Sequence, residues 1–318
     1  MTLIIYKLYF FLSRVKRSNI NKKNIKYLFS LKIIGYIEAY FNIFLVNYYR
    51  KKKNQKFGLN EKNRSEKIII SLTSFPKRID TVWITIETLM SQSMKADKII
   101  LWLAEEQFPN KLNDLPKSLL NQRSRGLTIR FCDDLRSHKK YFYTMQEYVD
   151  DLIVLVDDDM FYPSDTIKKL YKLHKKKPKD ICVITTQKIS PNILSMPSKW
   201  ENPKLNELLE STYKAQIFTG SGSLYVPHCL DDDVFNKELL LRICPYADDL
   251  WLTFMALKKG TRISSLSKWR SFPISIYGTN EGSLYYINAE NKMNDQQWQN
   301  LINNYSNEFK RLEKQYNE

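Results

Sequence analysis

Between residues 67 and 185, short apolar runs alternate with longer segments in which apolar residues recur at helical spacing. Each run has the length and continuous hydrophobicity of a strand buried on both faces, which is typical of parallel sheets. The predicted strands cover residues 67–74, 98–104, 127–132, 152–156 and 181–185. Helices are expected over residues 80–94 and 137–149, and from about residue 164. The alternation predicts an α/β fold with a mostly parallel, Rossmann-like central sheet flanked by helices.

The same pattern predicts where a ligand binds. In open parallel sheets, ligands lie outside the carboxyl ends of the strands. The residues of interest therefore follow the predicted strands directly, at 71–78, 104–106, 133–140 and 157–159.

Composition divides the chain into three predicted parts. Residues 1–64 are expected to form a helical, basic N-terminal extension and linker, because residues 54–66 are polar and rich in Lys and Asn. Residues 65–270 are expected to form the main domain, and residues 271–318 a helical C-terminal segment packed on it. The apolar side of that segment carries Trp298, Leu301, Ile302 and Tyr305.

The positive charge is concentrated in the N-terminal fifth of the chain. The protein has 50 basic and 34 acidic side chains, a formal charge of +16. Residues 1–67 hold 16 of the basic and 3 of the acidic side chains, so the rest is close to neutral. A nearly neutral body argues against a general nucleic-acid binder.

Glycine and cysteine usage argues against several kinds of site. The chain has 8 glycines and contains neither a G-x-G-x-x-G sequence nor a P-loop. Its four cysteines form no C-x-x-C pair, so neither a zinc knuckle nor a redox dithiol is indicated. They are expected to be reduced core thiols of a cytosolic protein.

Residues 33–49 are apolar and aromatic, and a basic run follows at 50–53. Two interpretations are open. The segment is either a helix on an anionic membrane surface, with its cations near the lipid headgroups, or a helix packed on the main domain. Residues 2–13 are apolar but too few for a span of ~20 residues, and no small-residue cleavage site follows them. The expected location is the cytoplasm, free or peripheral on the inner face of the plasma membrane.

Three consecutive carboxylates, Asp157, Asp158 and Asp159, follow the fourth predicted strand. In an extended segment, Asp157 and Asp159 would point to the same side. Carboxylates this close repel one another unless a cation or hydrogen-bond donors compensate them. Hard oxygen ligands suit Mg²⁺ or Mn²⁺, which share ligands with substrate phosphates. The alternative is a solvated acidic turn, and the position at the end of a buried strand favours the metal site.

The order of the predicted elements and this D-x-D sequence resemble GT-A glycosyltransferases, in particular the family-2-like bacterial enzymes that build surface polysaccharides. The resemblance covers roughly residues 67–265. It implies that residues 65–270 form a GT-A catalytic domain that binds a nucleotide-diphosphate sugar. It also implies that Mn²⁺ or Mg²⁺ is held by Asp157 and Asp159.

Two later segments add to the resemblance. Residues 218–227 contain Gly220 and Gly222, which permit close approach of the backbone to a ligand, although an ordinary turn gives the same pattern. A comparable loop in GT-A enzymes lines the cleft for the donor sugar and acceptor. Asp248 and Asp249 open an apolar helix, where acids are also favoured by the helix dipole. The resemblance implies that Asp249 is the general base and that Asp248 orients the acceptor or the sugar.

Further donor contacts are expected after the first and third strands, where a carboxylate could bond the nucleobase or ribose and a lysine could contact the diphosphate. A capped helix with a solvated basic face explains the third-strand residues equally well. The predicted donor-binding set is Ser71, Thr73, Arg78, Asp133, Lys139, Lys140, Asp157, Asp158, Gly220 and Gly222. Many GT-A enzymes use a late histidine as a third metal ligand. The last histidine here is His228, so that ligand is missing from the pattern.

Together these features predict an inverting, metal-dependent glycosyltransferase that acts on a glycan or lipid-linked acceptor in surface polysaccharide synthesis. A nucleotidyltransferase or sugar-phosphate transferase is a first alternative. It usually needs a glycine-rich loop after the first strand, and residues 74–78 contain no glycine. A non-catalytic, membrane-associated binding module is the second alternative, and it would bind no nucleotide sugar.

Overall fold

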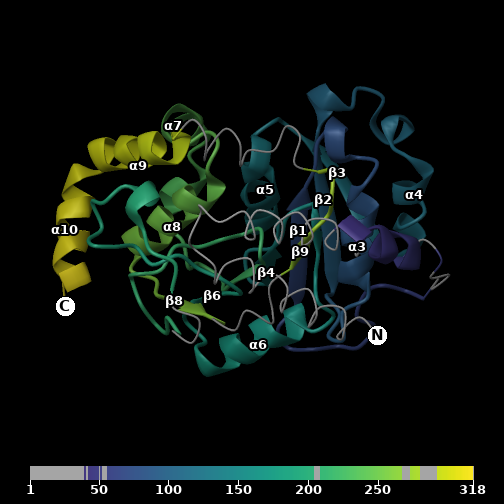
Figure 1. The fold of residues 1–318 in the computed structure, drawn as a ribbon, viewed down its shortest axis with the longest axis horizontal. Coiled ribbons are helices and arrows are strands. Elements are labelled where there is room, and N and C mark those ends of the chain that lie inside the picture. Colours follow the sequence, from purple (N-terminus) through teal and green to yellow (C-terminus); the bar gives the residue numbers. More distant parts are fainter. Residues whose placement is uncertain are drawn as a thin grey trace, which may run out of the picture.

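The computed structural model describes residues 39–40, 42–49, 51, 56–203, 208–266, 273–279 and 292–317. Within them, seven strands form one sheet in the order β3-β2-β1-β4-β7-β6-β8, and β5 pairs with β9 in a small second sheet (Figure 1). The strands are β1 Ile68–Thr73, β2 Lys98–Ala104, β3 Leu127–Cys132, β4 Leu152–Leu155, β5 Met160–Phe161, β6 Ile181–Val183, β7 Ser223–Tyr225, β8 Ile263–Ser265 and β9 Ile274–Ser275. The labelled helices are α3 Val82–Met90, α4 Lys117–Leu120, α5 Lys139–Glu147, α6 Thr166–Lys176, α7 Lys237–Ile243, α8 Asp248–Lys259, α9 Met293–Asn304 and α10 Ser306–Asn317.

The sheet is parallel from β3 through β2 and β1 to β4. The next strand, β7, is reversed and lies antiparallel to both β4 and β6, while β6 and β8 are parallel to each other. The α/β fold with a mostly parallel sheet and flanking helices is therefore as predicted. The reversal of β7 was not predicted, because strand direction depends on the pairing partners and leaves no local pattern.

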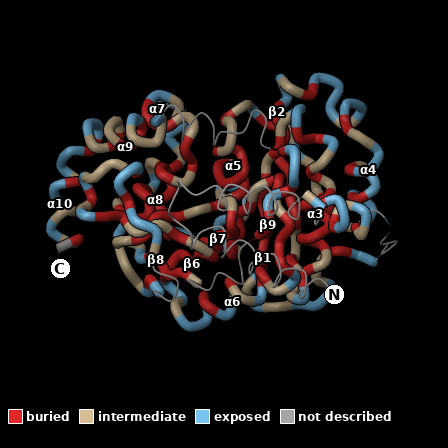
Figure 2. The backbone as a smooth tube through the Cα atoms, viewed as in Figure 1, coloured by how far each residue is buried: buried red, intermediate tan, exposed pale blue. Residues whose placement is uncertain are grey.

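Successive side chains of β1 enter two different apolar cores. Ile69 packs into the core on the side of α5, α8 and α9, while Ile68 and Ile70 pack into the core on the side of α3, α4 and α6. Burial on both faces explains why the strands appear in the sequence as unbroken apolar runs. Figure 2 shows the buried residues concentrated along the central strands and the exposed ones along the outer helices.

The C-terminal helices pack on the main domain. The Trp298 ring of α9 is fully buried and meets the ring of Trp200 edge-on, with centroids 5.0 Å apart. In α10, Phe309 stacks on Phe254 of α8 at 4.9 Å. Such aromatic pairs bury large apolar areas and prefer defined ring geometries, so they hold α9 and α10 on the main domain. The exact division of the chain at residues 64 and 270 stays a prediction.

An N-terminal helix covers β5 and β9. Residues 39–40, 42–49 and 51 are helical, and Leu45 and Tyr49 are buried against Phe161 and the β9 region. The Asn42 side chain accepts a hydrogen bond of 2.7 Å from the backbone N of Tyr277. One face of this helix is thus packed on the domain, as in the second interpretation given above.

The other face of the helix is exposed, with Tyr40 71% and Ile43 58% accessible. In the part of the chain that the structure describes, no helix has both the length and the apolar character that a membrane crossing needs. Residues 1–38, most of the basic run at 50–53 and residues 280–291 lie outside the described residues.

Candidate active site

Asp157, Asp158 and Asp159 lie in the bend between β4 and β5. The backbone turns here, so the side chains do not alternate as they would in an extended strand. Asp157 contacts Lys140, whereas Asp158 and Asp159 both contact Arg78. Asp157 and Asp159 therefore pair with different cations.

The first cation organises what we call the Arg78 group: Arg78, Ser74, Asp158, Asp159 and Thr279. Nη1 of Arg78 lies 2.6 Å from Oδ1 of Asp158, and Nη2 lies 3.0 Å from Oδ2 of Asp159. Nε donates to the carbonyl of Thr279 at 2.9 Å, and the Ser74 hydroxyl donates to Oδ2 of Asp158 at 2.6 Å. Asp158 is 4% exposed. The triplet is therefore no solvated acidic turn, because two of its carboxylates are held inside the protein by charge-assisted hydrogen bonds.

The second cation organises the Lys140 group: Lys140, Asp157, Thr219, Asp248 and Asp249. Lys140 is 2% exposed, and its Nζ donates to Oδ1 of Asp157 at 2.7 Å and to Oγ1 of Thr219 at 2.8 Å. The same nitrogen lies 3.0 Å from Oδ2 of Asp248. Burial disfavours the ammonium charge, but the carboxylates of Asp157 and Asp248 raise the pKa of Lys140 above its ordinary value. One buried ammonium thus joins the acidic triplet, through Asp157, to the second predicted acidic segment, through Asp248.

Asp249 lies in the first turn of α8 and is partly exposed. Its Oδ1 accepts two hydrogen bonds from Thr219, one from the backbone N at 2.9 Å and one from the hydroxyl at 2.7 Å. Desolvation, followed by the charge of Asp248, raises the pKa of Asp249 to about 7, while Lys140 opposes the rise. A carboxylate with a pKa near the working pH is suited to general-base catalysis.

Gly220 is held against the acidic triplet. A Cβ atom at this position would lie 2.2 Å from Oδ2 of Asp157, so any side chain would displace that carboxylate. The Tyr162 hydroxyl donates to the carbonyl of Gly220 at 2.6 Å and accepts from the backbone N of Asp157 at 2.9 Å. Gly222 has a φ of +104°, which favours glycine for conformational reasons. The close approach at Gly220 is to the protein's own carboxylate.

The site carries an excess of negative charge. Five carboxylates face two cations, Arg78 and Lys140. Oδ1 of Asp159 is buried without a hydrogen-bond partner among the described residues. Burial, and then the charge of Asp158, raise the pKa of Asp159 to about 7.

Both observations fit a hard divalent cation, which favours oxygen ligands and shares them with phosphates. Asp157 and Asp159 would hold it from the protein side. In the described ranges, no group of three or more His, Cys, Asp or Glu forms a complete metal site. Among the residues that the structure describes, side chains alone therefore do not complete the coordination, and a bound diphosphate would supply further ligands.

The predicted contacts after the first strand mostly have internal partners. Ser71 is fully buried and its hydroxyl donates to the carbonyl of Lys140 at 2.6 Å. The Thr73 hydroxyl donates to the carbonyl of Trp102 at 2.8 Å. These bonds tie strands and helices together, and a role for Ser71 or Thr73 in donor binding stays a prediction.

After the third strand, the predicted residues separate into buried and exposed ones. Lys139 is 2% exposed and donates to Oδ1 of Asp134 at 2.6 Å, so neither it nor Lys140 belongs to a solvated basic face. The side chain of Asp133 is 69% exposed and lies 2.5 Å from Nζ of Lys237. Of this set, Asp133 is the side chain that a ligand could reach most easily, and its role stays a prediction.

Three hydroxyl side chains of the site were not predicted, those of Ser74, Tyr162 and Thr219. Each acts through a hydroxyl that bonds to the triplet, to the 218–227 loop or to Asp249. A single hydroxyl in a sequence gives no signal of its own. Two positions could have indicated a role in the site: Ser74 directly follows β1, and Thr219 precedes Gly220.

His138 is buried beside the site but is a structural residue. Its ring nitrogens lie 3.2 Å from the Tyr141 hydroxyl and 3.0 Å from the carbonyl of Cys244. Burial lowers the pKa of His138 to about 4, so it is neutral at physiological pH. The four cysteines are buried and free, in line with the expected core thiols.

Among the comparisons with known proteins, the one with solved structures finds similar chains. No family model and no curated protein matches the chain. Residues 1–349 of S. aureus TarS are similar over 65% of this chain and 59% of that chain, with 12% identity and a TM-score of 0.43. The same protein in complex with UDP-GlcNAc gives 14% identity and a TM-score of 0.39, over 65% of this chain and 57% of that one. The mannosyltransferase PcManGT from Pyrobaculum calidifontis, in complex with GDP-Man and Mn²⁺, gives 13% identity and a TM-score of 0.39 over 70% of this chain and 64% of that chain. The matched region thus spans less than two thirds of each of these chains, and at this level of similarity the function rests on the residues of the site.

Proposed function

We propose that the protein is a metal-dependent, inverting glycosyltransferase that uses a nucleotide-diphosphate sugar. The observation that carries this proposal is the Lys140 group, in which one buried ammonium contacts Asp157 of the D-x-D triplet and Asp248, and reaches Asp249 through Thr219. Residues from α5, the β4–β5 bend, the 218–227 loop and α8 converge there. A structural core has no need for five carboxylates in one place, because each buried charge costs free energy unless it is compensated.

In the proposed mechanism, Asp249 removes the proton of the acceptor hydroxyl as its oxygen attacks the anomeric carbon of the donor sugar. The bond from that carbon to the diphosphate breaks on the opposite side, so the anomeric configuration inverts. Asp157 and Asp159 would hold Mn²⁺ or Mg²⁺, which supplies charge stabilisation for the departing diphosphate. Asp248, fixed by Lys140, would orient the sugar or the acceptor.

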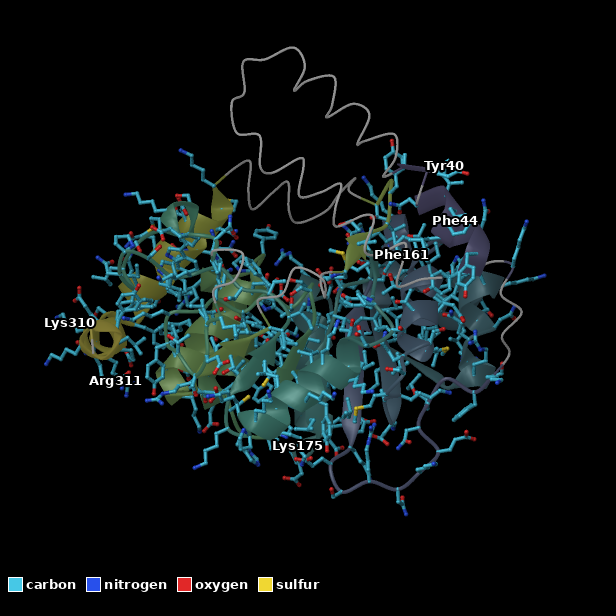
Figure 3. All side chains as sticks on the ribbon, turned by 60° about the horizontal axis from the view of Figure 1, so that its bottom comes forward. Tyr40, Phe44, Phe161, Lys175, Lys310 and Arg311 are labelled. Atoms are coloured by element: carbon cyan, nitrogen blue, oxygen red, sulfur yellow. The ribbon has the colours of Figure 1, made fainter. Side chains whose placement is uncertain are left out.

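The proposed acceptor is a glycan or lipid-linked glycan of a surface polysaccharide. The exposed face of the N-terminal helix supports a position at a membrane surface. Tyr40 and Phe44 project from this face (Figure 3), Ile43 is exposed as well, and Lys51 follows them. Aromatic and aliphatic side chains next to cations are typical of helices that lie on anionic bilayers. The helix is also joined to the site, since Asn42 bonds Tyr277 and Ile276 bonds the carbonyl of Asp159. We propose an anionic bilayer as the occupant of this face.

Vesicle binding tests the membrane part of the proposal. The full chain is expected to sediment with vesicles of phosphatidylglycerol and phosphatidylcholine, less so as salt is raised. Changing both Tyr40 and Ile43 to Ser should lower the bound fraction about tenfold or more, because two apolar side chains are lost. A matched control changes two exposed apolar residues elsewhere, Val149 and Leu208, to Ser. Equal losses in both variants, or no binding by the wild type, would exclude the membrane face.

The rival nucleotidyltransferase activity is less well supported. The loop after β1 contains no glycine, and its one buried cation, Arg78, already pairs with Asp158 and Asp159. A panel of nucleotide sugars with Mn²⁺ separates the two reactions. Glycosyl transfer or slow hydrolysis releases a nucleoside diphosphate, whereas nucleotidyl transfer from the same donor releases a sugar phosphate and sugar-phosphate transfer releases a nucleoside monophosphate. Release of a sugar phosphate or a nucleoside monophosphate in place of the nucleoside diphosphate, or no turnover of any nucleotide sugar, would contradict the proposal.

A further inference from the structure

We infer that Thr219 is a positioning residue for the general base. Its hydroxyl, oriented by Lys140, fixes one oxygen of Asp249 against the 218–227 loop, so that the other oxygen is available to the acceptor hydroxyl. The inference rests on the proposed function, because it gives the base assigned to Asp249 a defined orientation.

The direction of the hydrogen bonds follows from counting donors. Lys140 has three N–H donors and no acceptor, so it must donate to Oγ1 of Thr219, 2.8 Å away. The single hydroxyl hydrogen of Thr219 then has to point to another oxygen. Oδ1 of Asp249 lies at 2.7 Å, whereas Oδ2 of Asp248 lies at 3.1 Å and is already 3.0 Å from Lys140. The chain of donation therefore runs from Lys140 through Thr219 to Asp249.

Thr219 also holds Asp249 with its backbone. The backbone N of Thr219 donates to the same Oδ1 at 2.9 Å, so two donors from one residue converge on one carboxylate oxygen. The structure gives Oδ2 of Asp249 no hydrogen bond with any described residue, and the residue is partly exposed. A base needs this arrangement, in which the carboxylate is fixed and one oxygen remains open to the substrate.

The same loop fixes the base relative to the triplet. Gly220, the next residue, lies against Oδ2 of Asp157, and Lys140 bonds Oδ1 of that carboxylate. Movement of Thr219 would therefore change the distance between the base and the donor-side carboxylates. The spacing between the acceptor oxygen and the anomeric carbon depends on this distance, and small misplacements cost much of the rate.

The test removes the hydroxyl of Thr219 and keeps the branched shape of its side chain. Thr219→Val is expected to lower kcat about 10- to 100-fold, with the donor KM and the Kd of UDP with Mn²⁺ changed less than about twofold. Thr219→Ser restores the hydroxyl and should recover most of kcat. The matched control is Thr261→Val, beyond the other end of α8, which loses one hydroxyl hydrogen bond to the carbonyl of Cys229. It is expected to keep wild-type kcat.

A second measurement, the titration of Asp249, does not depend on enzymatic turnover. Carboxyl-carbon NMR of the labelled protein reports the pKa of Asp249, which should rise in Thr219→Val because a donor to the ionised form is lost. It should return in Thr219→Ser and stay unchanged in Thr261→Val. Wild-type kcat together with an unshifted Asp249 titration in Thr219→Val would overturn the inference. A wild-type protein inactive with every donor would refute the proposed function, and the NMR titration would still decide the role of Thr219.

Discussion

The Arg78 group and the Lys140 group are both built around a buried cation, yet they connect different parts of the molecule. Arg78 binds two neighbouring carboxylates of one bend and a carbonyl of residues 273–279. Lys140 binds three side chains from three separate segments, Asp157, Thr219 and Asp248. Arg78 therefore fixes the shape of the triplet, whereas Lys140 fixes the triplet relative to the Asp248–Asp249 pair. Substitution of Arg78 should therefore affect mainly the triplet, which faces the donor. Substitution of Lys140 should affect both the triplet and the Asp248–Asp249 pair.

The largest effect is expected from the base, Asp249, whose carboxylate accepts hydrogen bonds from Thr219 of the Lys140 group. Asp249→Asn should lower turnover about 10²- to 10⁴-fold, the usual contribution of a general base. Binding of UDP with Mn²⁺, measured by calorimetry, should survive, because the Arg78 group is untouched. Wild-type transfer by Asp249→Asn would remove the base assignment.

Replacing either buried cationic side chain tests whether the Arg78 group and the Lys140 group differ as described. Lys140→Met and Arg78→Met should each lower the free energy of unfolding by about 3–5 kcal/mol, since each leaves buried carboxylates unpaired. Denaturant unfolding measures this loss. Turnover at saturating donor should then fall much further in Lys140→Met, because only that variant also releases the Asp248–Asp249 pair. Equal turnover in the two variants would show that the groups do not differ as described.

Gly220→Ala should act on Asp157 alone. The added Cβ would lie 2.2 Å from Oδ2 of Asp157, so the carboxylate has to turn away. The expected result is a rise of about tenfold or more in the Mn²⁺ concentration that gives half-maximal activity, as for the loss of oriented metal ligation. Gly222→Ala is the control, because its strain at φ +104° comes with contacts of 3.4 Å or longer and should lower stability with less effect on metal demand. The same metal response in both variants would contradict the role of Asp157.

The smallest expected effect is that of pH on kcat/KM. The pKa of Asp249 is raised to about 7 by desolvation and by Asp248, against the effect of Lys140 and with a further contribution from Asp157. Because the base must be ionised, kcat/KM should fall tenfold per pH unit below about 7 and level off above it. The acidic limb should be absent in Asp249→Asn. A profile flat from pH 5 to 8 in the wild type would exclude a base that titrates in this range.

The sequence predicted the positions of the central strands, because burial on both faces leaves a continuous apolar run in the sequence. It also predicted that the acidic triplet follows the fourth of these strands. It placed Asp157 to Asp159, Asp248 and Asp249 among the functional residues, and the structure brings their side chains together. It did not predict their partners. Lys140 was expected to contact a diphosphate, but its three donors are used within the protein, and only tertiary contacts decide which carboxylate a buried amine meets.

Calorimetry of the wild type with UDP and with GDP, in the presence and absence of Mn²⁺, tests the central claim most directly. We predict that one of these nucleotides binds with Mn²⁺ and not without it, that Asp159→Ala abolishes this binding, and that Asp249→Asn retains it. Failure of both nucleotides to bind, or binding that is indifferent to Mn²⁺ and to Asp159, would contradict the account.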